Sequence, residues 1–274
     1  MTAFDTWLPV IAGLVAAGAC GGLLAGLLGV GGGIIIVPAL DFALQVAGLP
    51  RDAALHVAVA TSMATIIPTA ISSSRSHARR GSVDQAIVRL WLVPIVIGAL
   101  LGALAASHVD GRVLAGIFGT VALAAALKMM LPLDHVVLHQ GMPRGVAGVS
   151  IPAAIGAISA MMGIGGGTLA VPTMTLCGEP VHKAVGTAAL LGLWIALPAT
   201  AGYLLAQPAA DEMLPPLTIG YVSLLGLAVI APISWALAPV GAWLAHLLDR
   251  RKLAASFGVF LFIVALRMWY RALA

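Results

Sequence analysis

Long apolar runs separated by short polar linkers limit most strongly how this sequence can fold. Ten such runs fall at residues 7–28, 33–48, 54–73, 84–107, 112–131, 144–163, 168–177, 184–206, 217–247 and 253–272. A helix of about 20 apolar residues crosses a bilayer. Charged residues make up only 9% of the 274 residues, against about 25% in soluble domains. The runs do not alternate as barrel strands do. The sequence therefore predicts an all-α polytopic membrane protein.

The basic residues indicate its orientation. Three arginines lie in the linker 74–82, and three basic residues lie in the segment 248–252, so the positive-inside rule places both in the cytoplasm. The linker 207–216 is acidic and carries no Lys or Arg, which favours the outside. Ten segments with both termini outside satisfy all three assignments. The net charge of +4 then reflects membrane orientation, and we expect no nucleic-acid partner.

The second half of the chain repeats the first. The block "GVGGGIIIVP" at 29–38 returns as "GIGGGTLAVP" at 163–172, and "LHVAVATS" at 55–62 returns as "VHKAVGTA" at 181–188. Each half holds five runs, and an odd number reverses the orientation of the second half. We therefore expect two inverted five-segment repeats, 1–134 and 135–274, which together form one transport domain. The alternative is a duplicated bundle that transports nothing.

Each triple glycine interrupts an apolar stretch just before a short run, 33–48 or 168–177. A helix that begins after such a break has unpaired N–H groups and a partial positive charge at its start. Two such starts facing one cavity would attract a small anion without a buried cation. The predicted anion-binding residues are therefore Gly31, Gly32, Gly33, Gly165, Gly166, Gly167 and Thr168. The alternative is close packing of helices through small residues, which we favour for Gly22–Gly26 and Gly98–Gly102.

Hydroxyl side chains follow each break, in the third apolar run of each half. Thr61 and Ser62 in the first half, and Thr187 in the second, are further candidates for anion contacts. Ala188 replaces Ser62 in the second half, so a site that used this hydroxyl would be asymmetric. The alternative is that these hydroxyls bond to the backbone of their own helices.

Two equivalent histidines precede the threonines by about one turn. His56 and His182 are candidates for proton coupling or gating, because an intramembrane histidine can carry a proton near neutral pH. Both also lie near predicted loops, where a solvated or structural role is the alternative. Lys183 fits the positive-inside pattern or helps to draw in an anion. Asp41 is a lone acid within a run and has no acidic counterpart in the second half.

Enzyme motifs are missing from the sequence. It contains no HExxH, Walker loop, GxSxG or paired-carboxylate pattern, and its two cysteines, Cys20 and Cys177, form no CxxC motif. We therefore expect no enzymatic activity, no cofactor and no metal.

Several of these segments resemble the TauE/SafE sulfite exporter family of membrane transporters. The resemblance is carried by "GLLAGLLGVGGGIIIVPAL", "HVAVATS", "RRGSVD", "GAISAMMGIGGGTLAVP" and "HKAVGTAAL". It implies a permease of the bacterial cytoplasmic membrane that exports small anions such as sulfite, sulfoacetate or related organosulfur or organic anions. A channel-like anion pore and a non-transporting scaffold subunit are the alternatives, and a homo-oligomer stays open.

Overall fold

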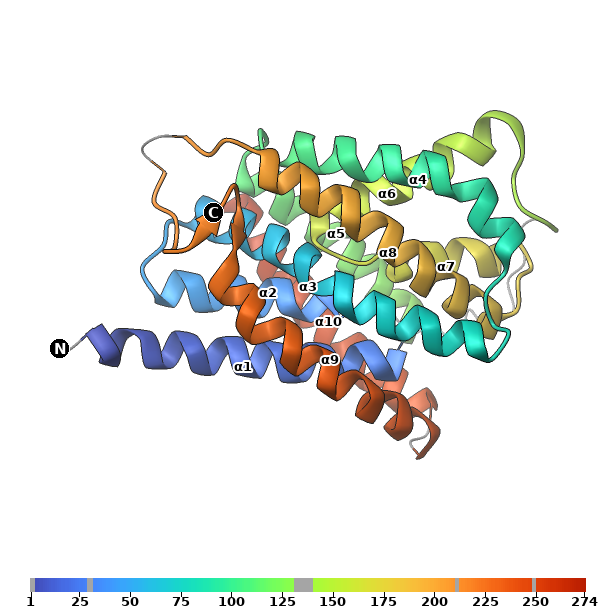
Figure 1. Ribbon diagram of the computed structural model, residues 1–274, viewed down its shortest axis with the longest axis horizontal. Helices are drawn as coiled ribbons and strands as arrows, with labels where there is room; N and C mark the ends of the chain where they lie inside the picture. Colours follow the sequence, from blue (N-terminus) through green and yellow to red (C-terminus); the bar gives the residue numbers. More distant parts are fainter. Residues whose placement is uncertain (1–2, 29–31, 131–139, 210–211, 248–249) are drawn as a thin grey trace.

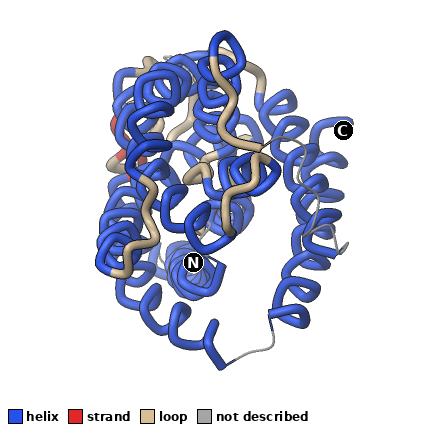
Figure 2. Tube along the Cα trace, turned by 90° about the vertical axis from the view of Figure 1, so that its right-hand side faces the viewer, coloured by secondary structure: helices blue, strands red, loops and turns tan. Residues whose placement is uncertain are grey.

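The computed structural model describes residues 3–28, 32–130, 140–209, 212–247 and 250–274, and almost all of them lie in helices (Figure 1). Each of the ten apolar runs overlaps one helix. The helices are α1 (Ala3–Leu28), α2 (Gly33–Val46), α3 (Arg51–Arg79), α4 (Gln85–Ala106), α5 (Gly111–Met130), α6 (Gly145–Met162), α7 (Gly167–Leu176), α8 (Val181–Leu205), α9 (Leu224–Leu247) and α10 (Arg250–Leu273). They form one elongated bundle, and Figure 2 views it along its length.

The lengths of the helices fit a membrane protein with two partial spans. Helices α3, α4, α5, α6 and α8 and the segment Leu224–Gly241 of α9 are long and apolar enough to cross a membrane. Helices α2 and α7 have 14 and 10 residues. At 1.5 Å per residue they reach only about 21 and 15 Å, less than the roughly 30 Å of a hydrocarbon core. The expected all-α polytopic membrane protein is thus confirmed.

The run 217–247 does not form a single helix. Its first residues form a two-stranded hairpin, β1 (Thr218–Ile219) and β2 (Val222–Ser223), with Thr218 paired to Ser223. Gly220 makes the turn between the strands at a positive φ of 55°, which glycine adopts without strain. The hairpin takes up the excess length of the run.

Five pairs of helices form the main contacts of the bundle: α1 with α9, α4 with α6, α5 with α10, α3 with α8, and α4 with α8. Glycine allows two of these pairs to pack closely. A Cβ on Gly22 would lie 2.6 Å from the backbone of Ser234 in α9, and one on Gly102 would lie 2.5 Å from the carbonyl of Ala157 in α6. A Cβ on Gly98 would likewise meet the Ala153 carbonyl. The interpretation of Gly22, Gly98 and Gly102 as packing positions is confirmed.

The connections separate into two groups at opposite ends of the bundle. In Figure 1 the two termini and the loop after α8 lie at the left end. The linker between α3 and α4 lies at the right end, as does the end of α9. This is the separation that the Lys and Arg pattern requires. Helix α3 occupies the centre, where every side chain from 53 to 66 is buried.

Candidate functional site

The two glycine breaks meet inside the bundle. A Cβ on Gly33, the first residue of α2, would collide with the carbonyl oxygen of Gly163 at the end of α6. The Ser62 hydroxyl of α3 donates a hydrogen bond of 2.8 Å to the same carbonyl. Both breaks are buried where the structure describes them. They are therefore interior features of the bundle and do not lie on its surface.

Left-handed glycines begin both short helices. Gly32 precedes α2 with φ 70° and ψ −19°, and Gly166 precedes α7 with φ 75° and ψ −21°. The near identity of the two conformations matches the sequence repeat. Of the other predicted glycines, Gly165 and Gly167 are buried beside Gly166. Gly31 lies outside the residues that the structure describes.

Thr61 and Thr187 make equivalent contacts across the molecule. The hydroxyl of Thr61 in α3 accepts a hydrogen bond of 3.0 Å from the N–H of Ser223, just before α9. The hydroxyl of Thr187 in α8 accepts one of 2.9 Å from the N–H of Asp84, just before α4. Asp84 in turn caps α4, because its carboxylate accepts from the N–H groups of Ala86 and Ile87. Each threonine thus fixes the start of a helix in the other half of the chain.

His56 bridges three segments at the end of the bundle that holds the termini. Its Nδ1 lies 2.8 Å from the Asp52 carbonyl, and its Nε2 lies 3.0 Å from the carbonyls of Ala106 and Val109. The ring stacks on Tyr221 of the β1–β2 hairpin with centroids 5.1 Å apart.

Tyr221 extends this network to the loop after α8. Its hydroxyl donates to the Glu212 carboxylate at 2.8 Å, and burial together with this carboxylate raises the pKa of Tyr221. The phenol therefore stays neutral. His182 and Lys183 are less enclosed: His182 is exposed at the start of α8, and Lys183 beside it is half-buried.

Two hydroxyls beside the second break are buried and have no hydrogen-bond partner among the described residues. They belong to Thr168, the second residue of α7, and Ser159, near the end of α6. Ser159 is only 1% exposed, and its Oγ lies 3.9 Å from where a Cβ on Gly166 would stand. Thr168 was among the predicted residues and Ser159 was not. The sequence feature that could have identified Ser159 is its position as a polar residue within an apolar run, seven residues before Gly166.

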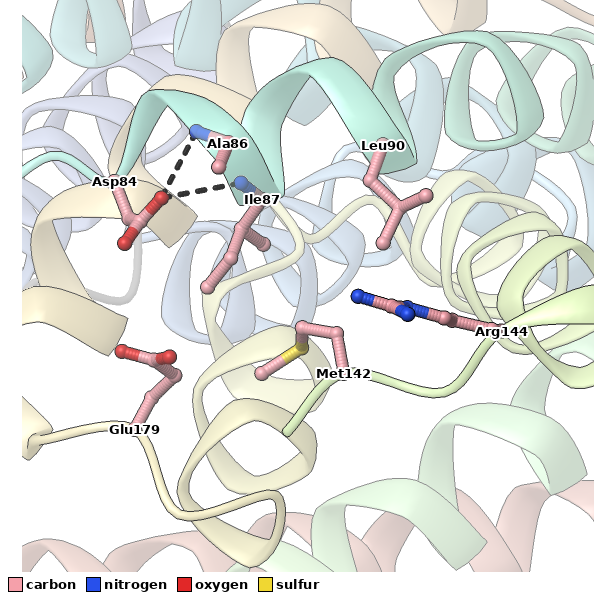
Figure 3. A pocket seen from close by; sticks show the side chains of 7 residues that line it. All are labelled: Asp84, Ala86, Ile87, Leu90, Met142, Arg144 and Glu179. Carbon is pink, nitrogen blue, oxygen red and sulfur yellow. Dashed lines mark hydrogen bonds between the residues drawn. The ribbon is translucent and has the colours of Figure 1, made fainter. Parts of the chain in front are cut away.

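Two cavities lie away from the glycine breaks. One, of about 260 Å³, is lined by Asp84, Ala86, Ile87, Leu90, Met142, Arg144 and Glu179 (Figure 3). Figure 3 shows the Arg144 guanidinium and the carboxylates of Asp84 and Glu179 on different sides of it. The second, of about 640 Å³, is lined by Gln140, Gly141, Met142, Pro143, Arg144, Ala147 and Ile151. The predicted site residues line neither of these two cavities.

Asp41 forms a buried ion pair behind the first break. Its carboxylate lies 2.5 Å from the guanidinium of Arg271 in α10, and the Gln45 side chain donates to it at 2.8 Å. Arg271 also donates to the carbonyl of Arg51 at the start of α3. The ion pair therefore connects the short helix α2 to α10, and the hydrogen bond of Arg271 connects both to the start of α3.

A bundle of apolar helices with two interrupted helices meeting in its interior defines the class: a multi-pass membrane protein with the broken helices typical of secondary transporters. The family model described as "Sulfite exporter TauE/SafE" matches residues 14–268. The chain therefore belongs to the TauE/SafE family of membrane transporters. Membership of a transporter family implies a function other than catalysis.

Relatives from distant organisms carry the same general description. A "Probable membrane transporter protein" of Haemophilus influenzae is 30% identical over 93% of this chain and 96% of its own. The "Probable membrane transporter protein YunE" of Bacillus subtilis is 30% identical over 60% of this chain and 66% of its own. No solved structure matches the chain significantly.

Proposed function

We propose that this protein is a secondary transporter that exports a small anion across the bacterial cytoplasmic membrane. Sulfite, sulfoacetate and related organosulfur or organic anions are the proposed substrates. The family description names sulfite export, and a small sulfur oxyanion suits a site made of backbone N–H groups and hydroxyls.

The contact between the two glycine breaks is the observation that carries the proposal. Helix α2 begins at this contact and α7 begins four residues after Gly163, and each begins with N–H groups that its own helix cannot pair. The helix starts provide partial positive charge in a buried environment, where electrostatic interactions are strong. An anion held between them needs no buried Lys or Arg.

The proposed site lies between two inverted repeats, 1–134 and 135–274. The packing supports this architecture. The repeat relates α1 to α6 and α4 to α9, so the pairs α1–α9 and α6–α4 are equivalent contacts. The pairs α3–α8 and α5–α10 each join a helix to its own equivalent in the other half. The hydrogen bonds Thr61–Ser223 and Thr187–Asp84 are also equivalent. Rocking of one half against the other would then expose the site to each side in turn.

Export of an anion does not require a coupling ion. With the cell interior negative, an anion that leaves gains about 2.3 kcal/mol per charge for each 100 mV. Proton coupling through His56 would add to this driving force if protons entered as the anion left, whereas attraction by His182 and Lys183 would raise only the local concentration of the anion.

Flux through proteoliposomes tests the proposal. The purified protein, reconstituted with internal sulfite, sulfoacetate or thiosulfate, is expected to give saturable efflux that a positive-outside potential accelerates. A current that rises linearly with voltage would favour a pore. If no anion in the panel moves or binds, while the protein stays folded and inserted, the proposed function is wrong.

A further inference from the structure

The hydroxyl groups around the two breaks differ in what they contact. Those of Thr61 and Thr187 accept from backbone N–H groups, and that of Ser62 donates to the Gly163 carbonyl. The hydroxyls of Ser159 and Thr168 have no partner among the described residues. A buried hydroxyl without a hydrogen bond destabilises a fold, so such groups indicate a role other than stability. These two hydroxyls lie beside the second break, whereas a third unpartnered hydroxyl of the described residues, that of Thr200, lies on α8.

The start of α7 adds backbone donors at the same place. The first hydrogen bonds of this helix run from the N–H groups of Leu169 and Ala170 to the Gly166 carbonyl, at 3.1 and 2.7 Å. The N–H groups of Gly167 and Thr168 precede them and have no partner within the helix. The Ser159 Oγ lies 3.9 Å from where a Cβ on Gly166 would stand, so this hydroxyl is close to the residue that directly precedes α7.

The described residues of the first break have no hydroxyls at the two equivalent positions. In the sequence repeat, Ala25 and Ile34 stand where the second half has Ser159 and Thr168. Both are buried and apolar. The first break thus offers methyl groups and backbone, whereas the second offers two hydroxyls as well.

We propose that the anion site is one-sided: the substrate's oxygens are held at the second break by the hydroxyls of Ser159 and Thr168 and the first N–H groups of α7. This inference rests on the proposed function and names the residues that determine its specificity. All these donors are neutral, and they come from residues on both sides of the second break. Such a site suits a compact oxyanion with negative charge spread over several oxygens, as in a sulfite or sulfonate group.

Binding and stability measured on the same variants test the inference. Ser159→Ala and Thr168→Val each remove one unpartnered hydroxyl with little change of shape. Loss of a hydrogen bond to a charged group is expected to weaken binding of radiolabelled sulfite about 10- to 100-fold. The melting temperature of the substrate-free protein is expected to stay the same or rise, because each change removes a buried polar group that lacks a partner. Thr168→Ser should retain most of the binding.

Matched controls lie on the same or a neighbouring element. Thr173→Val on α7 and Ser74→Ala on α3 remove hydroxyls that donate to their own helices, to the carbonyls of Leu169 and Ile71. They are expected to leave sulfite affinity within about twofold of the wild type.

The outcomes separate this inference from the proposed function. If the wild type binds sulfite or sulfoacetate and both site variants bind it equally well, the one-sided site is wrong while the transport proposal stands. If the variants lose binding only together with a lower melting temperature, the two hydroxyls are structural and the inference is overturned. If the wild type binds no anion, the proposed function itself fails.

Discussion

Thr61 and Thr187 are equivalent side chains that fix the two halves of the molecule to each other. Each hydroxyl accepts a hydrogen bond from a buried or half-buried backbone N–H at the start of a helix far away in sequence. The sequence indicated that these residues are special, but it suggested contact with an anion or with their own helix. The contact with the other half depends on the tertiary fold, which local pattern does not reveal.

Replacing Thr187 by Val should therefore lower stability. The change leaves the Asp84 N–H without its acceptor, which costs about 1–3 kcal/mol. Thermal unfolding in detergent should show a lower melting temperature, and Thr187→Ser should restore it. An unchanged melting temperature together with weaker anion binding would contradict the structural role and return Thr187 to the substrate site.

Gly32 tests the conformation of the first break. Gly32→Ala places a side chain at φ 70° and brings its Cβ to 2.6 Å from the Gly21 carbonyl. The left-handed backbone costs about 1–2 kcal/mol for a residue with a Cβ, and overpacking typically adds about 1–3 kcal/mol. Gly81→Ala is the matched control, since Gly81 has φ 67° and open space around it. Thermal unfolding should show a larger loss for Gly32→Ala than for Gly81→Ala, and equal losses would contradict the close contact.

At the scale of helices, the positions and lengths of the apolar runs predicted most of the fold. The runs 33–48 and 168–177 correspond to α2 and α7, and glycine followed by proline marked both breaks. The β1–β2 hairpin was not predicted, because 217–223 continues an apolar run. Its geometry depends on Gly220, where a Cβ would meet the Tyr203 carbonyl. Such a contact arises only after the helices have packed.

The pairing of α4 with α6 should depend on the absence of side chains at their contact. Gly102→Ala would bring a Cβ to 2.5 Å from the Ala157 carbonyl, so the helices must separate, at a cost of about 1–3 kcal/mol. Gly116→Ala in α5 meets nothing closer than the Ala272 methyl at 3.8 Å and should be neutral or stabilising. Unfolding midpoints of the two variants give the comparison. Equal midpoints would refute close packing of α4 on α6.

The link between α2 and α10 depends on a buried charge pair. Asp41→Asn leaves the Arg271 guanidinium without its carboxylate and should cost about 3–5 kcal/mol. The double variant Asp41→Leu with Arg271→Met removes both charges and should recover much of that stability. Chemical denaturation of the three proteins measures the coupling. A double variant less stable than Asp41→Asn would contradict the argument.

For the whole molecule, the sequence repeat predicted where the site should be sought but not which groups in it are available to a ligand. Equivalent glycines at 32 and 166 adopt the same conformation, and each directly precedes a short helix. The asymmetry lies in side chains that the repeat does not share, Ser159 and Thr168. The hydroxyls of Thr61 and Thr187 accept hydrogen bonds, whereas those of Ser159 and Thr168 have no partner among the described residues. This difference is a property of the folded chain and cannot be predicted from the sequence.

The position of a bound anion tests the central claim most directly. Crystals of a variant with both cysteines replaced by alanine, grown with selenite as a sulfite analogue, would locate the anion through the anomalous signal of selenium. We predict one peak within hydrogen-bonding distance of Ser159, Thr168 and the first N–H groups of α7. A peak confined to the cavity beside Arg144, with none at the glycine breaks, would contradict the account.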